Sequence, residues 1–122
     1  MSKDKLRTRD YLGHILQAIE RIERYTVAID QDAFMMDQLI QDGVIRNIEI
    51  LGEAANNVKK TDPDFADRHP EIPWVAIYAM RNRMSHAYFQ VDLGVVWNTI
   101  QNDLPTMKQQ IHALALAWQA DL

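Results

Sequence analysis

The sequence predicts an all-α fold, a mainly antiparallel bundle of four to five helices. Apolar residues recur at spacings of three and four along most of the chain, and only four glycines and four prolines occur in 122 residues. No segment alternates apolar and polar residues as a half-buried strand does. A hydrophobic fraction of 48% suffices for a core, and the length predicts one domain spanning 1–122.

The first amphipathic helix is expected from about residue 5 to residue 26. Its apolar positions repeat with spacings of three, four and three, and charged residues fill much of the remainder. These positions are Leu12, Ile15, Ile19 and Ile22. In the short connection that follows, Asp30 or Asp32 can cap a further turn that holds Phe34.

The second long helix is expected over residues 37–60. Gly43 and Gly52 interrupt its apolar rhythm, and each costs about 1 kcal/mol relative to alanine in a helix interior. A glycine at such a position indicates either close packing of a neighbouring backbone or simple tolerance.

The proline-rich segment 61–73 is predicted to be a loop. Pro73 suits the first turn of a third helix, which is expected to end between residues 87 and 90. Asp92 is a good N-cap for the last helix. The apolar phase of that helix continues across Pro105, which predicts one kinked helix.

Composition restricts the possible function and location. The formal charge of −4 has the wrong sign for a general nucleic-acid binder, so any RNA contact needs a local cluster of cations. The first residues lack the apolar core of a signal peptide, and no apolar run is long enough for a membrane span. The absence of cysteine fits a reducing compartment. We therefore expect a cytoplasmic protein without a membrane partner.

Residues 81–88 concentrate chemically active side chains. Arg81, Asn82, Arg83, His86 and Tyr88 place two guanidiniums, an amide, an imidazole and a phenol within eight residues. Arginine binds phosphate through a planar fork, and histidine exchanges protons near neutral pH. RNA cleavage without a metal requires such groups, because a base removes the ribose 2′-OH proton and a cation stabilises the phosphorane.

The spacing sets a geometric condition on such a site. In a regular helix, Arg81 and His86 lie about 140° apart, whereas Asn82 and His86 share a face and the amide can orient the imidazole. A working site therefore needs either a helix that ends near His86 or a second copy of the motif across a dimer axis. Spacing alone favours the plainer interpretation, a solvated helix end with a structural histidine.

The chain nevertheless resembles the HepT-like proteins of the HEPN family over nearly its whole length. Arg81, four intervening residues, His86 and then Tyr88 match the family's R-x-x-x-x-H-x-Y form. Further blocks agree in order. They are residues 10–15 with 18–19, residues 44–54, residues 72–74 and residues 91–97.

This resemblance implies a homodimeric HEPN bundle that acts as the toxin of a type VII-like toxin–antitoxin system. It implies a metal-independent endoribonuclease, with transfer RNA as the expected target. Arg81 would hold the scissile phosphate, His86 would act as general acid or base, and Asn82 would position them. Tyr88 matches the tyrosine to which the cognate minimal nucleotidyltransferase antitoxin attaches AMP. Ala87 departs from the glycine common in relatives, without removing a functional atom.

Other candidates are weaker. Glu53 can orient Arg81 if their helices are neighbours, although a solvated glutamate is an equally good interpretation. Arg46 and Arg83 are the best additional cations for RNA. Arg83 has the better claim because it lies inside the motif, whereas a surface ion pair is the favoured interpretation of Arg46. His14 and the other histidines outside the motif have no partner at ligand spacing, so no metal or other cofactor is expected. The alternative function is a non-catalytic nucleotide- or partner-binding subunit of the nucleotidyltransferase complex, and a plainer one is a helical dimerisation module.

Overall fold

The computed structural model describes the backbone of residues 2–86 and 92–120, and the side chains of residues 7–82 and 92–117. All regular structure in these ranges is helical, which confirms the predicted all-α class. In chain order the elements are α1 (Ser2–Thr26), α2 (Gln31–Met36), α3 (Gln38–Thr61), α4 (Pro63–Arg68), α5 (Trp74–His86), α6 (Leu93–Asn98), the π-helical segment η1 (Thr99–Asp103) and α7 (Leu104–Ala120).

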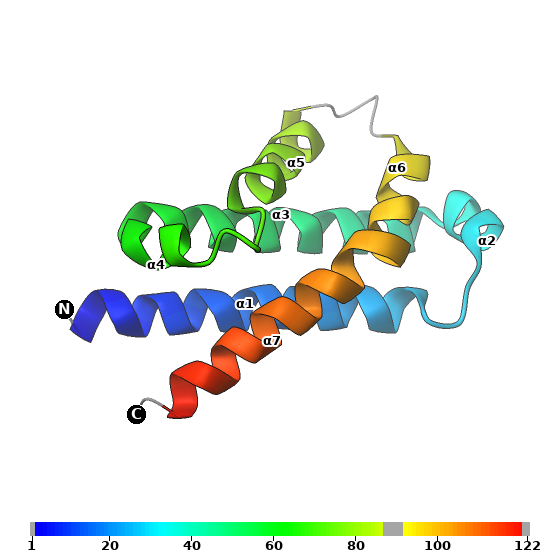
Figure 1. Ribbon diagram of the computed structural model, residues 1–122. Helices are drawn as coiled ribbons and strands as arrows, with labels where there is room; N and C mark the ends of the chain where they lie inside the picture. The colour runs from blue at the N-terminus through cyan, green and yellow to red at the C-terminus, as the bar shows by residue number, and fades with distance from the viewer. Residues whose placement is uncertain (1, 87–91, 121–122) are drawn as a thin grey trace.

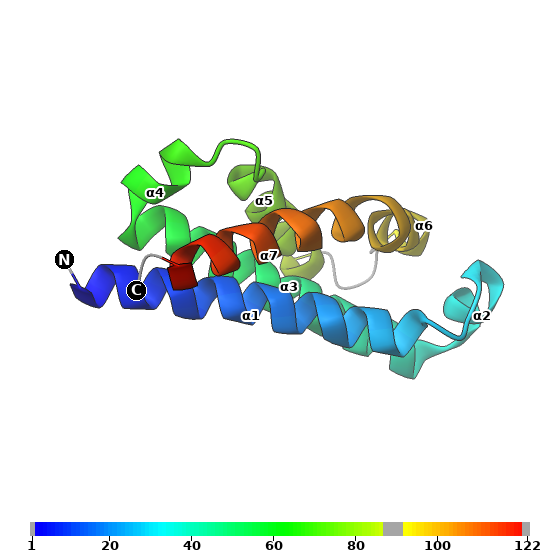
Figure 2. The same cartoon turned by 60° about the horizontal axis from the view of Figure 1, so that its bottom comes forward.

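Two long antiparallel helices form the centre of the molecule. α1 and α3 lie side by side along most of their length, α5 packs on α3, and α7 crosses α1 obliquely (Figures 1 and 2). The apolar stripe predicted for the first helix is fully buried between them, because Leu12, Ile15, Ile19 and Ile22 are at most 1% exposed. Each such side chain contributes about 1.5–3 kcal/mol by its burial. The same packing fixes the relative positions of α1, α3 and α5.

The two aspartates before α2 and α3 cap these helices. Asp30 accepts a hydrogen bond from the Ala33 amide at 2.9 Å, and Asp37 accepts one from the Ile40 amide at 3.1 Å. Asp30 is therefore the cap for the turn that holds Phe34, and Asp32 is a first-turn residue of that helix. Phe34 is fully buried.

The predicted loop over residues 61–73 is wrong in part, because it contains helix α4. Pro63 occupies the first turn, and the Asp62 carboxylate accepts a hydrogen bond from the Phe65 amide at 3.3 Å. Phe65 is buried, so the turn also gains apolar contact with the core. Proline and a capping aspartate start this helix, although proline-rich composition indicated a loop. α5 begins at Trp74, so Pro73 directly precedes the helix instead of lying in its first turn, and its carbonyl oxygen accepts a hydrogen bond from the Ile77 amide.

Gly52 allows α5 to cross α3 at close range. A Cβ atom at this position would collide with Cβ of Arg81 and would lie 2.9 Å from its Cγ and 3.2 Å from the Ile77 carbonyl oxygen. Of the two explanations for this glycine, close packing of a neighbouring helix is therefore confirmed. Because Gly52 has no side chain, Arg81 packs directly against α3.

The C-terminal helix is bent, as predicted, and its bend coincides with a π-helical segment. Asp92 caps α6 by accepting hydrogen bonds from the amides of Gly94 and Val95 at 3.0 and 3.2 Å. η1 then ends immediately before Leu104 and Pro105. Because proline lacks an N–H and its ring clashes with the carbonyl four residues earlier, wider π turns before it relieve the conflict.

An ion pair connects α7 to α1. The Lys108 ammonium donates a hydrogen bond to the Glu23 carboxylate at 2.8 Å, and this bond raises the pKa of Lys108. Both side chains are at the surface, so the pair contributes little to stability. Within the described ranges, no helix is both long and apolar enough to span a membrane.

Candidate functional site

An open cleft with a volume of about 320 Å³ lies where α1, α3 and α5 meet. α3 contributes most of its wall, and α1 and α5 add one residue each. The lining residues are His14 of α1, Arg46, Glu49, Ile50, Glu53, Ala54 and Asn57 of α3, and Arg81 of α5. The cleft is thus mostly polar.

Arg81 is held in this cleft by three neighbours. Its Nε atom lies 3.3 Å from a carboxylate oxygen of Glu53, and its Nη1 group donates a hydrogen bond to the Asn82 amide oxygen at 3.1 Å. The guanidinium carbon lies 5.9 Å from the centre of the Tyr78 ring, within the range of a cation–π contact. The side chain is 26% exposed. The guanidinium is therefore fixed in place and still reachable from solvent.

The contact between Arg81 and Glu53 is an ion pair without a directed hydrogen bond. The Nε atom is buried, and its N–H does not point at an acceptor closely enough to form a hydrogen bond. Charge attraction at 3.3 Å still holds the carboxylate beside the guanidinium. Among the described residues, only Asn82 accepts a hydrogen bond from this guanidinium. Its other terminal N–H groups are thus available to a ligand in the cleft.

The charges that line the cleft are balanced between two cations and two carboxylates. Arg46 and Arg81 supply the cations, and Glu49 and Glu53 supply the carboxylates. No three histidine, aspartate or glutamate side chains in the described ranges are arranged to hold a metal ion. An anion in this cleft would meet a guanidinium that one acid has already oriented.

The structure places part of the predicted motif. Glu53 does reach Arg81, and Asn82 bonds to the arginine. Arg83 and His86 belong to α5, but their side chains lie outside the described residues.

Tyr88 and Ala87 lie outside the described residues altogether, as does the range 87–90 in which the third helix was expected to end.

Sequence reasoning missed the contribution of His14, Glu49 and Asn57 to this cleft, and it treated Arg46 as a surface residue. The exposed Arg46 side chain does lie at the surface, and it also lines the cleft. A signal was present, because residues 46, 49, 53 and 57 repeat with spacings of three, four and four and form a polar stripe on one helix face. No local pattern indicates that His14, on another helix, joins this stripe.

Comparisons with known proteins identify related sequences. The family described as "Ribonuclease HepT-like" matches residues 15–114. A Thermococcus cleftensis protein named "Probable ribonuclease HepT" is 43% identical over 106 residues, or 87% of this chain and 94% of that protein. A Methanocaldococcus jannaschii protein named as a gamma-glutamylcyclotransferase and candidate RNase is 42% identical over 101 residues, or 83% of this chain and 44% of that protein. No solved structure matches this chain.

Proposed function

Because this chain belongs to the family of HepT-like ribonucleases, we propose that it is a metal-independent endoribonuclease that acts on RNA, with transfer RNA as the expected substrate. In this proposal it is the toxin of a type VII-like toxin–antitoxin pair in the cytoplasm. Its partner is a minimal nucleotidyltransferase antitoxin, which silences it by attaching AMP to Tyr88.

The observation that carries the proposal is the fixed guanidinium of Arg81 at an open cleft. Glu53 pairs with the Nε side of the guanidinium and Asn82 accepts from Nη1, so the remaining terminal N–H groups are positioned to donate to a phosphate. A guanidinium held in this way loses little side-chain entropy when it binds phosphate. The guanidinium also donates hydrogen bonds to the phosphorane oxygens, on which negative charge develops. These bonds stabilise the transition state more than the ground state.

The proposed reaction needs one proton acceptor and one proton donor besides this cation. The 2′-OH loses its proton to a base, the 2′-oxygen attacks phosphorus, and the 5′-oxygen leaves with a proton. The products are a 2′,3′-cyclic phosphate end and a free 5′-OH end. We assign proton transfer in this reaction to His86, whose imidazole can accept or donate a proton near neutral pH.

A homodimer would bring these groups together across the interface. Arg81 and His86 lie about 140° apart around a regular helix, so one copy of such a helix would present them in different directions. α5 lies on the outside of the bundle (Figure 1), and its Val75 side chain is 62% exposed. This placement lets α5 of a second copy approach and supply the missing histidine.

AMP on Tyr88 would silence the enzyme by charge and bulk. The tyrosine is two residues beyond His86 in the sequence. A phosphodiester attached there adds a negative charge close to the histidine and repels the RNA phosphate. The adenosine also takes up space that the substrate needs.

The proposal is tested with protein produced without its antitoxin and verified by mass to be unmodified. It is incubated with total transfer RNA in EDTA, beside Arg81→Ala and His86→Ala variants and an Arg24→Ala control. Arg24 is an exposed arginine on α1 that does not line the cleft. We expect cleavage by the native protein and the control, and none by the other two.

Intact RNA from folded, unmodified, dimeric protein would refute a nuclease acting on transfer RNA. If that protein still binds the nucleotidyltransferase or a nucleotide, the non-catalytic binding subunit becomes the better description. Cleavage that survives Arg81→Ala would instead place the reaction outside this cleft.

A further inference from the structure

One end of the molecule exposes an unusual amount of apolar surface. We call this end the α2 tip and define it as residues 27–42, which form the α1–α2 connection, α2 and the start of α3. Met36, Leu39 and Val27 are 87%, 83% and 82% exposed there. Single exposed apolar residues are ordinary. However, five of the eight large apolar side chains exposed in the described ranges lie between residues 25 and 39.

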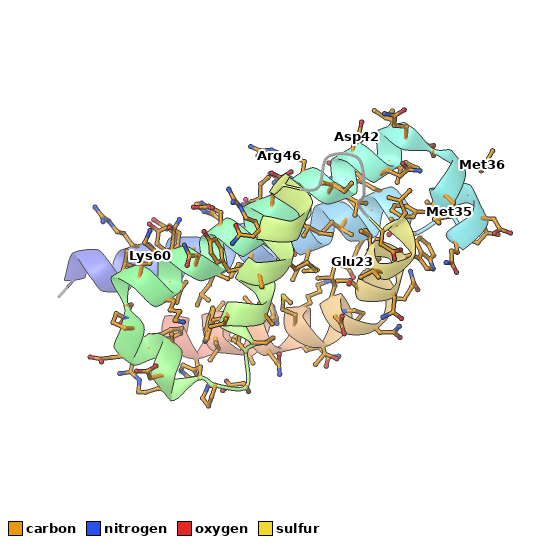
Figure 3. All side chains as sticks on the ribbon, turned by 90° about the horizontal axis from the view of Figure 1, so that it is seen from above. Glu23, Met35, Met36, Asp42, Arg46 and Lys60 are labelled. Atoms are coloured by element: carbon orange, nitrogen blue, oxygen red, sulfur yellow. The ribbon has the colours of Figure 1, made fainter. Side chains whose placement is uncertain are left out.

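The inner side of the α2 tip packs closely against the rest of the protein. Phe34 is fully buried, and its ring centre lies 5.3 Å from that of Trp97. The Gln41 side-chain amide donates a hydrogen bond to the Phe34 carbonyl oxygen at 2.9 Å. Asp30 and Asp37 cap the two helices. The exposed side chains are thus presented by an anchored backbone, and Figure 3 shows Met35 and Met36 at this end of the molecule.

The tip also carries the whole net charge of the protein. Residues 27–42 contain four aspartates and no lysine, arginine or histidine, which gives a formal charge of −4. The remainder of the chain has 13 Lys and Arg residues against 13 Asp and Glu residues, so it is formally neutral. Asp32 and Asp42 are exposed in the same segment as the apolar side chains. The α2 tip therefore combines exposed acidic groups with exposed apolar side chains.

This combination of exposed apolar and acidic side chains favours one class of binding partner over the others. RNA is disfavoured, because its phosphates would be repelled by the aspartates. A second copy of the tip is disfavoured, because a two-fold contact places the same acidic patch on both sides. A protein surface with lysine or arginine around an apolar side chain satisfies both features, since apolar contact gives affinity and opposite charge speeds the encounter.

We propose that the α2 tip is the docking surface for a protein partner whose contact surface presents an apolar side chain framed by lysine or arginine. This inference rests on the proposed function, in which that partner is the nucleotidyltransferase antitoxin. Leu39 and Glu53 are fourteen residues apart on one helix, which corresponds to about 20 Å. A partner bound to the tip can therefore remain anchored while the RNA cleft is empty or occupied.

The test measures binding of the purified nucleotidyltransferase to the native protein and to matched variants. Leu39→Asp places a charge on the tip, and Leu116→Asp makes the same change at a 53% exposed leucine on α7, near the opposite end of the molecule. Aspartate is tolerated in the first turn of a helix, so Leu39→Asp should fold. We expect Leu39→Asp to weaken binding at least ~30-fold, and Leu116→Asp to leave it unchanged.

The charge component is tested by Asp32→Asn combined with Asp42→Asn. This double variant is expected to associate more slowly and with a weaker dependence on salt. RNA cleavage by all three variants should match that of the native protein, since none of the changed residues lines the cleft.

Each other outcome has one meaning. Binding unaffected by Leu39→Asp overturns the docking surface and leaves the proposed function intact. No binding by the native protein overturns both the docking surface and the assigned partner, whereas RNA cleavage is judged separately. Conversion of a native dimer to a monomer by Leu39→Asp makes the tip a self-interface and refutes the inference.

Discussion

At the residue scale, the chemistry of the cleft depends on how Arg81 is restrained. A charged carboxylate lies 3.3 Å from Nε of the guanidinium, and an amide oxygen lies 3.1 Å from Nη1. Restraint of this kind orients a donor before the substrate arrives, and preorganised donors are the main source of electrostatic stabilisation in enzymes. Two substitutions separate the charge of Arg81 from its orientation.

Arg81→Lys is expected to reduce kcat for RNA cleavage by about 100-fold or more. Lysine keeps the positive charge but replaces the planar fork with a flexible point charge. The measurement is single-turnover cleavage of a transfer RNA transcript in EDTA. A variant within a few-fold of the native rate would show that charge alone is sufficient at this position.

Glu53→Ala is expected to lower kcat about tenfold and to change KM little. In our proposal the carboxylate does not contact the RNA but holds the arginine in position. Its loss therefore weakens stabilisation of the transition state more than it weakens binding of the substrate. Glu53→Gln should recover part of the rate, because its amide oxygen can still approach the Nε group. Undiminished cleavage by a folded Glu53→Ala protein would rule out this positioning role.

At the element scale, the position of Arg81 depends on the crossing of α3 and α5 at Gly52. No side chain separates the two helices there, and the Arg81 Cγ atom would be 2.9 Å from any added Cβ. A change at Gly52 should therefore alter both stability and catalysis, whereas alanine at a helical glycine with open space around its Cβ position should alter stability alone.

Gly52→Ala is expected to lower the free energy of unfolding by about 1–2 kcal/mol. Overpacking against Cβ of Arg81 and a backbone oxygen costs up to ~3 kcal/mol, which exceeds the gain of about 1 kcal/mol in helix propensity. Gly13→Ala is the matched control, because no atom lies within 4 Å of its added Cβ. That variant should gain roughly 1 kcal/mol.

Urea denaturation measures both changes, and RNA cleavage by the same samples measures the effect on the site. If both glycine variants are stabilised to the same extent, the close approach at Gly52 has no energetic importance.

The sequence predicted the long helices well, because their apolar spacing reports burial directly. It missed α4, since proline and polar residues signal a loop as often as a helix start, and the buried Phe65 that settles the question is a tertiary feature. It left a contact between Glu53 and Arg81 open beside a solvated glutamate, and the structure shows the contact. It could not place His14 in the cleft, because the pairing of α1 with α3 is set by packing and not by any local pattern.

At the scale of the whole molecule, the uneven charge distribution removes an objection to RNA binding. The formal charge of −4 belongs to the α2 tip, and the rest of the chain is neutral. Phosphate contacts need favourable charge only at the atoms that they meet, and in the cleft Arg46 and Arg81 offset Glu49 and Glu53. An acidic protein can therefore bind RNA at one place and a basic protein at another.

A mixture of Arg81→Ala and His86→Ala proteins tests whether each site is shared between two copies. If Arg81 of one chain works with His86 of its partner, a mixed dimer keeps one intact site, and an equal mixture should recover roughly a quarter of native activity. The measurement is transfer RNA cleavage after the two inactive proteins have been mixed and allowed to exchange. No recovery, although exchange of subunits is verified, would place each complete site within a single chain.

The contact between Gly52 and Arg81 also has an evolutionary consequence. A lineage that gains a larger residue at position 52 must move α5 away from α3, and the arginine then loses the carboxylate that orients it. Positions 52 and 81 should therefore change together among relatives of this chain. A relative with a bulky residue at the first position is expected to have lost the arginine as well, and to survive as a binding protein without nuclease activity.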